Sequence, residues 1–132
     1  MGIIKKALAL GILYFSFITF VPAIAHYSSE RNINSQEKLE KIVNEEKKKL
    51  KCDKEIKIKL TDEGVTYTKT KMKGNEIIGR EIIFRDIYTS RNVIKHELYH
   101  ACKQNPQSSF GLDYFLWNEP TAIIYSITGI EL

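Results

Sequence analysis

The sequence predicts a small α+β domain, with an N-terminal helix, a three-stranded and mainly antiparallel sheet, and two further helices. Three observations predict it. The first is a charged segment whose apolar residues recur at helical spacing, and the second is a set of three strand-like segments separated by turn residues. The third is a pair of late segments with helical patterns and good capping residues. About 107 residues follow the first 25, enough for one small core and therefore for one domain over residues 26–132.

The first 25 residues have the pattern of a secretory signal peptide. Lys5 and Lys6 form a positive end, residues 7–21 are almost wholly apolar, and small residues precede a predicted cleavage after Ala25. The apolar run of about fifteen residues is shorter than the roughly twenty that span a bilayer. We therefore expect an exported protein, secreted or periplasmic, with no stable membrane association after cleavage. An uncleaved N-terminal helix that anchors the protein in a membrane is the alternative.

Charge gives no reason to expect a nucleic-acid partner. The formal net charge is +4, and the loss of Lys5 and Lys6 with the signal reduces it to +2. The Lys-rich segment 36–51 also contains glutamates, in pairs such as Glu37 and Lys41 that lie one turn apart on a helix. We expect this segment to be a solvated helix, and we expect a peptide or protein as partner.

The helix of this Lys-rich segment has a clear start and an apolar face. Ser35 is a good N-cap residue, so we expect the helix to begin at the next residue and to continue to about Leu50. Its apolar residues share one side, which we expect to face the core. This stripe consists of Leu39, Ile42, Val43 and Leu50.

Three segments then have strand patterns. Residues 55–60 alternate apolar residues with lysines, and residues 65–70 are rich in Thr, Tyr and Val. Residues 76–85 form a longer strand that Gly79 interrupts. Turn residues, glycine among them, separate the segments. Because short turns join neighbouring strands, mainly antiparallel pairing is expected.

The most informative feature is the run His96-Glu97-Leu98-Tyr99-His100, an H-E-x-x-H motif. Thr89 and Ser90 are good N-cap residues, and residues 91–104 contain no Gly or Pro, so a helix is expected there. Two His four residues apart on a helix can bind one Zn²⁺, and Glu97 can take a proton from a water that the metal activates. The alternative is a surface helix with two ordinary His.

A catalytic zinc site needs a third protein ligand. Downstream of the motif, the candidate carboxylates are Asp113, Glu119 and Glu131. Asn118 can cap a helix and a proline follows in the first turn, so Glu119 would lie at the start of a second helix packed against the first. We therefore prefer Glu119 as the ligand, with Asp113 as second choice. The alternative role of Glu119 is a carboxylate stabilised at a helix N-terminus.

The motif, followed after about twenty residues by Asn118-Glu119, resembles the gluzincins, the thermolysin-like zinc metallopeptidases. The resemblance implies a minimal, single-domain zincin-like fold. It implies Zn²⁺ held by His96, His100 and Glu119, with Glu97 as the general base of peptide hydrolysis. It also implies that an extended peptide binds along a sheet edge, and we expect the third strand to be that edge.

Two positions depart from the family pattern. In the family, an Asp one turn after the third ligand orients a zinc-bound His, and Ile123 stands there in this chain. The orienting partner must therefore come from elsewhere. The family also uses a downstream His or Tyr to steady the oxyanion. Tyr114 and Tyr125 are candidates that spacing does not distinguish.

The chain has two cysteines, Cys52 and Cys102, and an even pair in an exported protein suggests a disulfide. Such a bridge would join the end of the first helix to the core-facing side of the motif helix. Two free buried thiols are the alternative, and a Cys52 thiolate on the metal is a third that the spacing does not support. That core-facing side consists of Ile94, Leu98, Ala101 and Cys102.

These observations together predict an exported zinc-dependent metallopeptidase that acts on peptides or proteins. The alternative is a non-catalytic module on the same fold that binds zinc or a protein. It would bind metal without turnover, and a change of Glu97 would leave its function intact.

Overall fold

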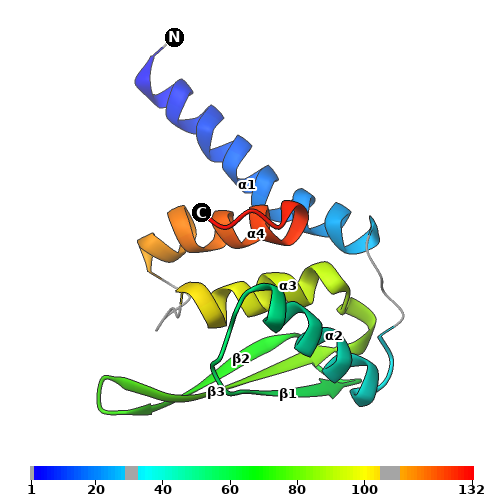
Figure 1. Cartoon of the computed structure of the whole chain (residues 1–132). Helices are drawn as coiled ribbons and strands as arrows, with labels where there is room; N and C mark the ends of the chain where they lie inside the picture. The colour runs from blue at the N-terminus through cyan, green and yellow to red at the C-terminus, as the bar shows by residue number, and fades with distance from the viewer. Residues whose placement is uncertain (1, 29–32, 105–110) are drawn as a thin grey trace.

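A computed structural model describes residues 2–28, 33–104 and 111–132, without the side chains of Ser28 and Phe115. Its elements form layers (Figure 1). A three-stranded sheet lies on one side, α2 and α3 cover it, and α1 and α4 pack on α3. This confirms the predicted α+β class. The elements are α1 (Ile3–Ser28), α2 (Gln36–Lys49), β1 (Ile56–Thr61), β2 (Tyr67–Lys73), β3 (Glu76–Arg85), η1 (Asp86–Tyr88), α3 (Arg91–Tyr99), η2 (His100–Gln104), η3 (Tyr114–Asn118) and α4 (Glu119–Thr128).

Helix α2 begins where the sequence predicts. The Ser35 side chain accepts a hydrogen bond from the Lys38 backbone N–H at 3.2 Å and so caps the first turn. One charged residue, Glu46, is fully buried on the same face as the apolar stripe. Arg91, the first residue of α3, donates to it at 2.8 Å. The predicted stripe is buried in full: Leu39, Ile42, Val43 and Leu50.

The sheet is mixed, with the strand order β1-β3-β2. Strands β2 and β3 form the expected antiparallel hairpin, whereas β1 runs parallel to β3, with Ile58 opposite Ile82. Strand β3 is therefore central, and the expectation that it forms the exposed edge is wrong. Its consecutive residues Ile82, Ile83 and Phe84 are all buried, so both of its faces are covered. Strands β1 and β2, at the two edges of the sheet, are rich in lysine. Charged side chains on edge strands disfavour strand pairing with other protein molecules.

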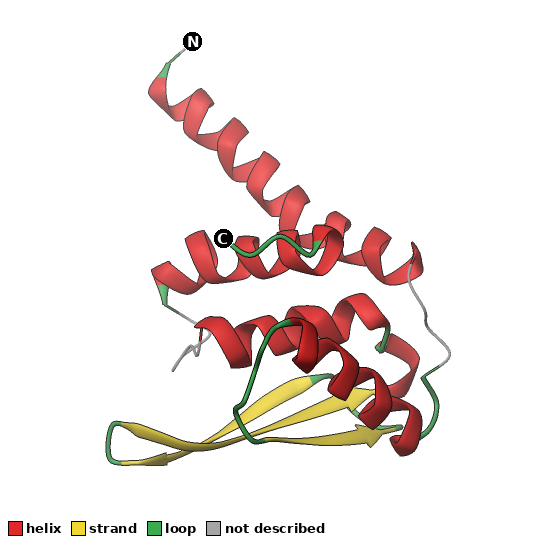
Figure 2. Cartoon of the chain, in the orientation of Figure 1, coloured by secondary structure: helices red, strands yellow, loops and turns green. Residues whose placement is uncertain are grey.

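Gly79 marks a bulge and not a break in β3. Lys71 pairs with Gly79 and Met72 pairs with Ile77, so β3 has one extra residue at this point. Glycine is common at bulges because they require irregular backbone and increase the local twist. The turn between β2 and β3 reaches past the helices that cover the rest of the sheet (Figure 2).

The motif helix also begins as predicted, since the Ser90 side chain caps it by accepting a hydrogen bond from the Val93 backbone N–H at 3.2 Å. Helical structure continues to Gln104, the expected end. The last five residues, His100–Gln104, form a π-helical turn in place of an α-helical one. Single π-turns inside helices occur frequently at functional sites.

The helix that carries Glu119 is longer than predicted. Asn118 does not cap it, because its backbone is helical and its side chain makes no capping hydrogen bond. The π-helical turn η3 leads directly into α4, so Glu119 lies inside a continuous helical segment. The segment ends at Gly129, whose left-handed backbone allows its N–H to bond the Tyr125 carbonyl oxygen at 2.8 Å.

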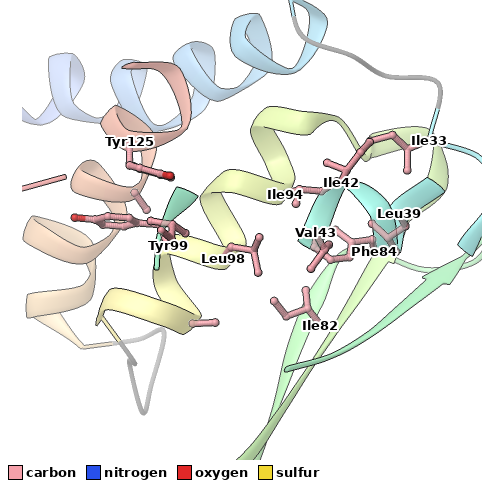
Figure 3. Packing of buried hydrophobic residues seen from close by; sticks show 13 residues of the cluster. Ile33, Leu39, Ile42, Val43, Ile82, Phe84, Ile94, Leu98, Tyr99 and Tyr125 are labelled. Atoms are coloured by element: carbon pink, nitrogen blue, oxygen red, sulfur yellow. The ribbon is translucent and has the colours of Figure 1, made fainter. Parts of the chain in front are cut away.

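One apolar core joins α2, β3 and α3 (Figure 3). Val43 of α2 and Phe84 of β3 lie on one side of it, and Leu98 of α3 faces them. The core continues to α4 through the stacked rings of Tyr99 and Tyr125, whose centroids are 4.8 Å apart. The site-bearing helices α3 and α4 are therefore held by the same core.

Cys52 and Cys102 form a disulfide with a Cα–Cα distance of 5.6 Å. This confirms the predicted pairing and excludes both free thiols and a Cys52 thiolate on a metal. The bridge closes a sequence separation of 50 residues. Because Cys102 lies in η2, it ties the segment after α2 to the turn that begins with His100.

Helix α1 continues past the predicted cleavage site, from Ile3 to Ser28. Its part Ile3–Tyr27 is 25 residues long, with a mean hydropathy of 2.1, and is long and apolar enough to cross a membrane. A signal sequence near the N-terminus meets the same criteria. The helix is longer than the apolar segment 7–21, whose shortness favoured a cleaved signal peptide. The length of the segment therefore does not distinguish a signal peptide from a membrane anchor. Its N-terminal half projects from the domain, while its C-terminal end lies beside α4 (Figure 1).

Candidate metal centre

Three predicted ligands meet between α3 and α4. Nε2 of His96 lies 3.1 Å from Oε1 of Glu119, and Nε2 of His100 lies 3.0 Å from Oε2 of the same carboxylate. The two Nε2 atoms are 3.2 Å apart. His100 is buried, and His96 and Glu119 are half-buried. This cluster could bind a metal ion, and it joins residues that are up to 23 positions apart in the sequence.

The distances suit a four-coordinate metal. Around a tetrahedral ion with bonds of about 2.0–2.1 Å, ligand atoms lie roughly 3.3 Å from one another. The three separations in the cluster, 3.0 to 3.2 Å, are close to that value. Two imidazoles and one carboxylate also suit a transition metal better than Ca²⁺ or Mg²⁺, which prefer oxygen ligands alone. The residues present therefore fit a metal ion of this kind.

Charges within the cluster favour an ionised carboxylate. Burial tends to raise the pKa of Glu119, but hydrogen bonds with His100 and His96 outweigh burial and hold that pKa well below its usual range. Burial likewise tends to lower the pKa of His96. The hydrogen bond with Glu119 and the charges of Glu97 and Glu119 outweigh it, so the pKa is raised. A cation placed here would satisfy the same negative charge.

Gln104 orients His100, and the sequence analysis missed it. Nδ1 of His100 lies 2.6 Å from Oε1 of Gln104, so an N–H at Nδ1 leaves Nε2 free to bind a metal. The Gln104 amide in turn donates to the hydroxyl of Thr121, which donates to the Trp117 carbonyl oxygen at 2.7 Å. These hydrogen bonds hold the imidazole of His100 in place. Ile123, which is fully buried in α4, has no polar side-chain atom that could do so. The signal was available: Gln104 lies one turn after His100.

Of the two candidate tyrosines, Tyr114 lies at the cluster. Its Oη is 3.3 Å from Nε2 of His100, and the two rings stack with centroids 5.1 Å apart. Tyr125 packs in the core on Tyr99 and carries the Lys95 ammonium over its ring, so it belongs to the core and not to the site. Burial first, then the charge of Glu119, raise the pKa of Tyr114, and its hydroxyl therefore keeps its proton.

Glu97 lies beside the ligand cluster and lines a cavity of 210 Å³ with His96 and Glu119. The cavity is where a water molecule or a small group could approach the centre. Part of its wall comes from α1, a contribution that the sequence analysis did not foresee. The other residues that line it are Ile18, Pro22, Ala25, Asn92, Val93 and Ser126.

The other candidate carboxylates lie outside the cluster. Asp113 is exposed at the start of η3 and does not join the three ligands. Glu131 is exposed and forms an ion pair with Lys103 at 3.1 Å. Among the described residues, Glu119 is therefore the carboxylate that meets both His.

Comparisons of the chain with protein-family models, with curated proteins and with solved structures found no match. The resemblance to gluzincins therefore rests on the H-E-x-x-H motif and on the cluster that its two His form with Glu119.

Proposed function

We propose that this chain is an exported zinc-dependent metallopeptidase. The observation that carries the proposal is the convergence of His96, His100 and Glu119 in one cluster, with Glu97 in the wall of the cavity that His96 and Glu119 also line. Three protein ligands that leave a fourth position open are typical of catalytic zinc sites. The disulfide and the apolar N-terminal helix support export, since disulfides persist mainly in oxidising compartments.

Each residue of the site has a role in this proposal. A bound Zn²⁺ would polarise a peptide carbonyl and lower the pKa of water. Glu97 would accept the proton of the attacking water and deliver it to the leaving amine. Tyr114, which keeps its proton, would donate a hydrogen bond to the developing oxyanion. Gln104 would hold His100 in the tautomer that binds the metal through Nε2.

Metal content tests the site itself. The full chain is purified in detergent, and its zinc is measured by elemental mass spectrometry beside Glu119→Ala and Asp113→Ala. We expect about one zinc per chain in the wild type and in Asp113→Ala, and clearly less in Glu119→Ala, because three-ligand binding loses one ligand. Equal zinc in all three proteins would remove Glu119 from the site, and its absence from the folded wild type would refute the proposal.

Glu97→Gln separates an enzyme from a non-catalytic metal-binding module. The substitution removes the general base but none of the three ligands. We expect the variant to keep its zinc and to lose hydrolysis of a quenched fluorescent peptide library by about 10²-fold or more. Full activity in Glu97→Gln would exclude Glu97 as the general base. Zinc binding with no turnover of any library, both in the wild type and in a chain that begins at His26, would favour the module.

A membrane-anchored form of the same enzyme is the second candidate, and the burial of Ala25 favours it. The residue before the predicted cleavage is only 6% exposed, and its carbonyl oxygen accepts a hydrogen bond from Asn92 at 3.0 Å. A protease cannot reach such a bond once the domain has folded. Intact mass spectrometry of the protein from soluble and membrane fractions distinguishes the secreted form from the anchored form. A soluble chain that begins at His26 supports secretion, and a full chain in the membrane supports the anchor.

A further inference from the structure

The C-terminal half of α1 lies over the metal centre. Ile18, Pro22 and Ala25 line the same 210 Å³ cavity as Glu97 and Glu119. Small-ligand sites usually measure about 300–1,000 Å³, so the cavity is too small for an extended peptide. It has room for water and one small group. With α1 in this position, the cavity beside Glu97 does not hold an extended peptide.

The contact between α1 and the domain is specific. Most of the less exposed residues of α1 recur at intervals of three and four, which places them on one face of the helix, and Ser16 and His26 beside this face are also half-buried. Leu13, Phe15, Phe20 and Ile24 on the other sides stay exposed. The hydroxyl oxygen of Tyr14 is buried within electrostatic reach of Glu119. The packed face consists of Tyr14, Phe17, Ile18, Val21, Pro22 and Ala25.

A polar contact holds the end of this face. Asn92, in the first turn of α3, donates from its side chain to the Ala25 carbonyl oxygen at 3.0 Å. Ala25 itself is buried, and a larger side chain there would push α1 away from α3 and α4. The neighbouring Ile24 is 68% exposed, so a change at that position leaves the packed face untouched.

We propose that the C-terminal half of α1 is a cover for the candidate metal centre. This half of the helix must move away from the domain before a polypeptide substrate reaches Glu97, and only then is it open to cleavage. The inference rests on the proposed function. In this proposal α1 has two roles. It directs the chain to export or anchors it in a membrane, and in the folded protein it keeps the site inactive until α1 is displaced.

The test uses the full chain in detergent micelles, as wild type, Ala25→Phe, Asn92→Ala and the matched control Ile24→Phe. Two rates are measured: removal of bound zinc by EDTA, and labelling of His96 by diethyl pyrocarbonate in metal-free protein. We expect Asn92→Ala to raise both rates about fivefold, as for one lost hydrogen bond, and Ala25→Phe to raise them at least as much. Ile24→Phe should match the wild type. Circular dichroism checks that each variant folds, and Asn92→Ala alone suffices if Ala25→Phe does not.

The outcomes separate the cover from the metal site. Equal rates of zinc removal and of His96 labelling in all four proteins would overturn the cover. If the wild type binds no zinc, the proposed function fails, but faster labelling of His96 in the two opened variants would still support a cover over this cavity. If opening α1 speeds zinc removal but reduces peptide hydrolysis, α1 forms part of the working site and the cover is refuted.

Discussion

Gln104 shows how an imidazole of the candidate metal centre can be oriented by an amide in place of a carboxylate. Its amide accepts from His100 and donates to Thr121, so both of its polar groups are engaged. The π-helical turn His100–Gln104 brings these two side chains together at the end of the motif helix. A neutral amide orients the imidazole without adding a second negative charge to a cluster that already contains Glu119 and lies beside Glu97.

Removing this amide should weaken metal binding. We expect Gln104→Ala to bind zinc roughly 10–100-fold more weakly, because loss of an orienting partner typically has that effect. Gln104→Glu should retain most of the affinity, since a carboxylate accepts the same hydrogen bond. The dissociation constants are measured by competition with a chromophoric chelator. Lys103→Ala, an exposed neighbour, is the control, and an unchanged affinity in Gln104→Ala would exclude the orienting role.

Metal binding should also depend on pH through His96. The neutral imidazole binds the metal, and the pKa of His96 in the metal-free chain is raised above 6.5. As the pH is lowered, the affinity for zinc should therefore start to decrease while the pH is still above 6.5. The decrease should be about tenfold per pH unit for an imidazole that must lose a proton to bind. Glu97→Gln removes one of the charges that raise this pKa, so its affinity should fall only at lower pH. Identical pH profiles for zinc binding in the two proteins would contradict this.

At the scale of elements, the packing of α2 on α3 includes a buried ion pair. Glu46 of α2 has a side-chain exposure of 0%, and Arg91 of α3, with 27%, contacts it at 2.8 Å. Arg91 also contacts the more exposed Glu45 at 3.1 Å. The pair positions the start of the motif helix, because Arg91 is its first residue. A buried carboxylate that loses its partner is costly, whereas the intact pair itself contributes little net stability.

Arg91→Met should therefore lower the free energy of unfolding by about 3 kcal/mol, measured by urea titration. Adding Glu46→Gln to this variant should recover part of the loss, because the buried carboxylate would otherwise keep only the exposed Lys49, 3.1 Å away, as its cationic partner. Lys103→Met breaks the exposed pair with Glu131 and should change stability by less than about 1 kcal/mol. Equal losses in Arg91→Met and Lys103→Met would show that burial of Glu46 does not matter.

At the scale of the whole molecule, the disulfide joins the two halves of a small core. The bridge from Cys52 to Cys102 closes a sequence separation of 50 residues, within which lie the entire sheet and the whole of α3. A domain of this size buries a smaller share of its surface than a large one, so a crosslink across a long loop matters more. The bridge also lies two residues from His100 and so restrains the turn that carries this ligand.

The double variant Cys52→Ala/Cys102→Ala should lose about 3–4 kcal/mol of unfolding free energy, the value expected for a loop of this length. Urea unfolding of the variant and of the wild type measures the difference. Reductant should shift the wild type by a similar amount and leave the variant unchanged. A variant as stable as the oxidised wild type would show that the bridge contributes no net stability to the fold.

Local signals in the sequence were sufficient for most of the elements and for the three residues that meet at the candidate metal centre. Ser35 and Ser90 cap the helices that they predict, the three strand patterns form three strands, and the motif at helical spacing brings two imidazoles to one face. Capping, side-chain alternation and helical spacing act over a few residues, so they can be read without knowing the fold. Glu119 and the cysteine pair could be anticipated because few residues of the right chemistry are present.

Other features depend on contacts between segments that are far apart in the chain, and only the tertiary structure shows them. It placed β3 between two edge strands, so that the consecutive apolar residues Ile82, Ile83 and Phe84 lie in the middle of the sheet and are buried. It extended the Glu119 helix back through Asn118, where a local capping preference gave way to helical packing on α3. It also set α1 over the metal centre. The sequence by itself determined which residues could form the centre, and three-dimensional packing determined their partners and access, because those depend on contacts between segments far apart in the chain.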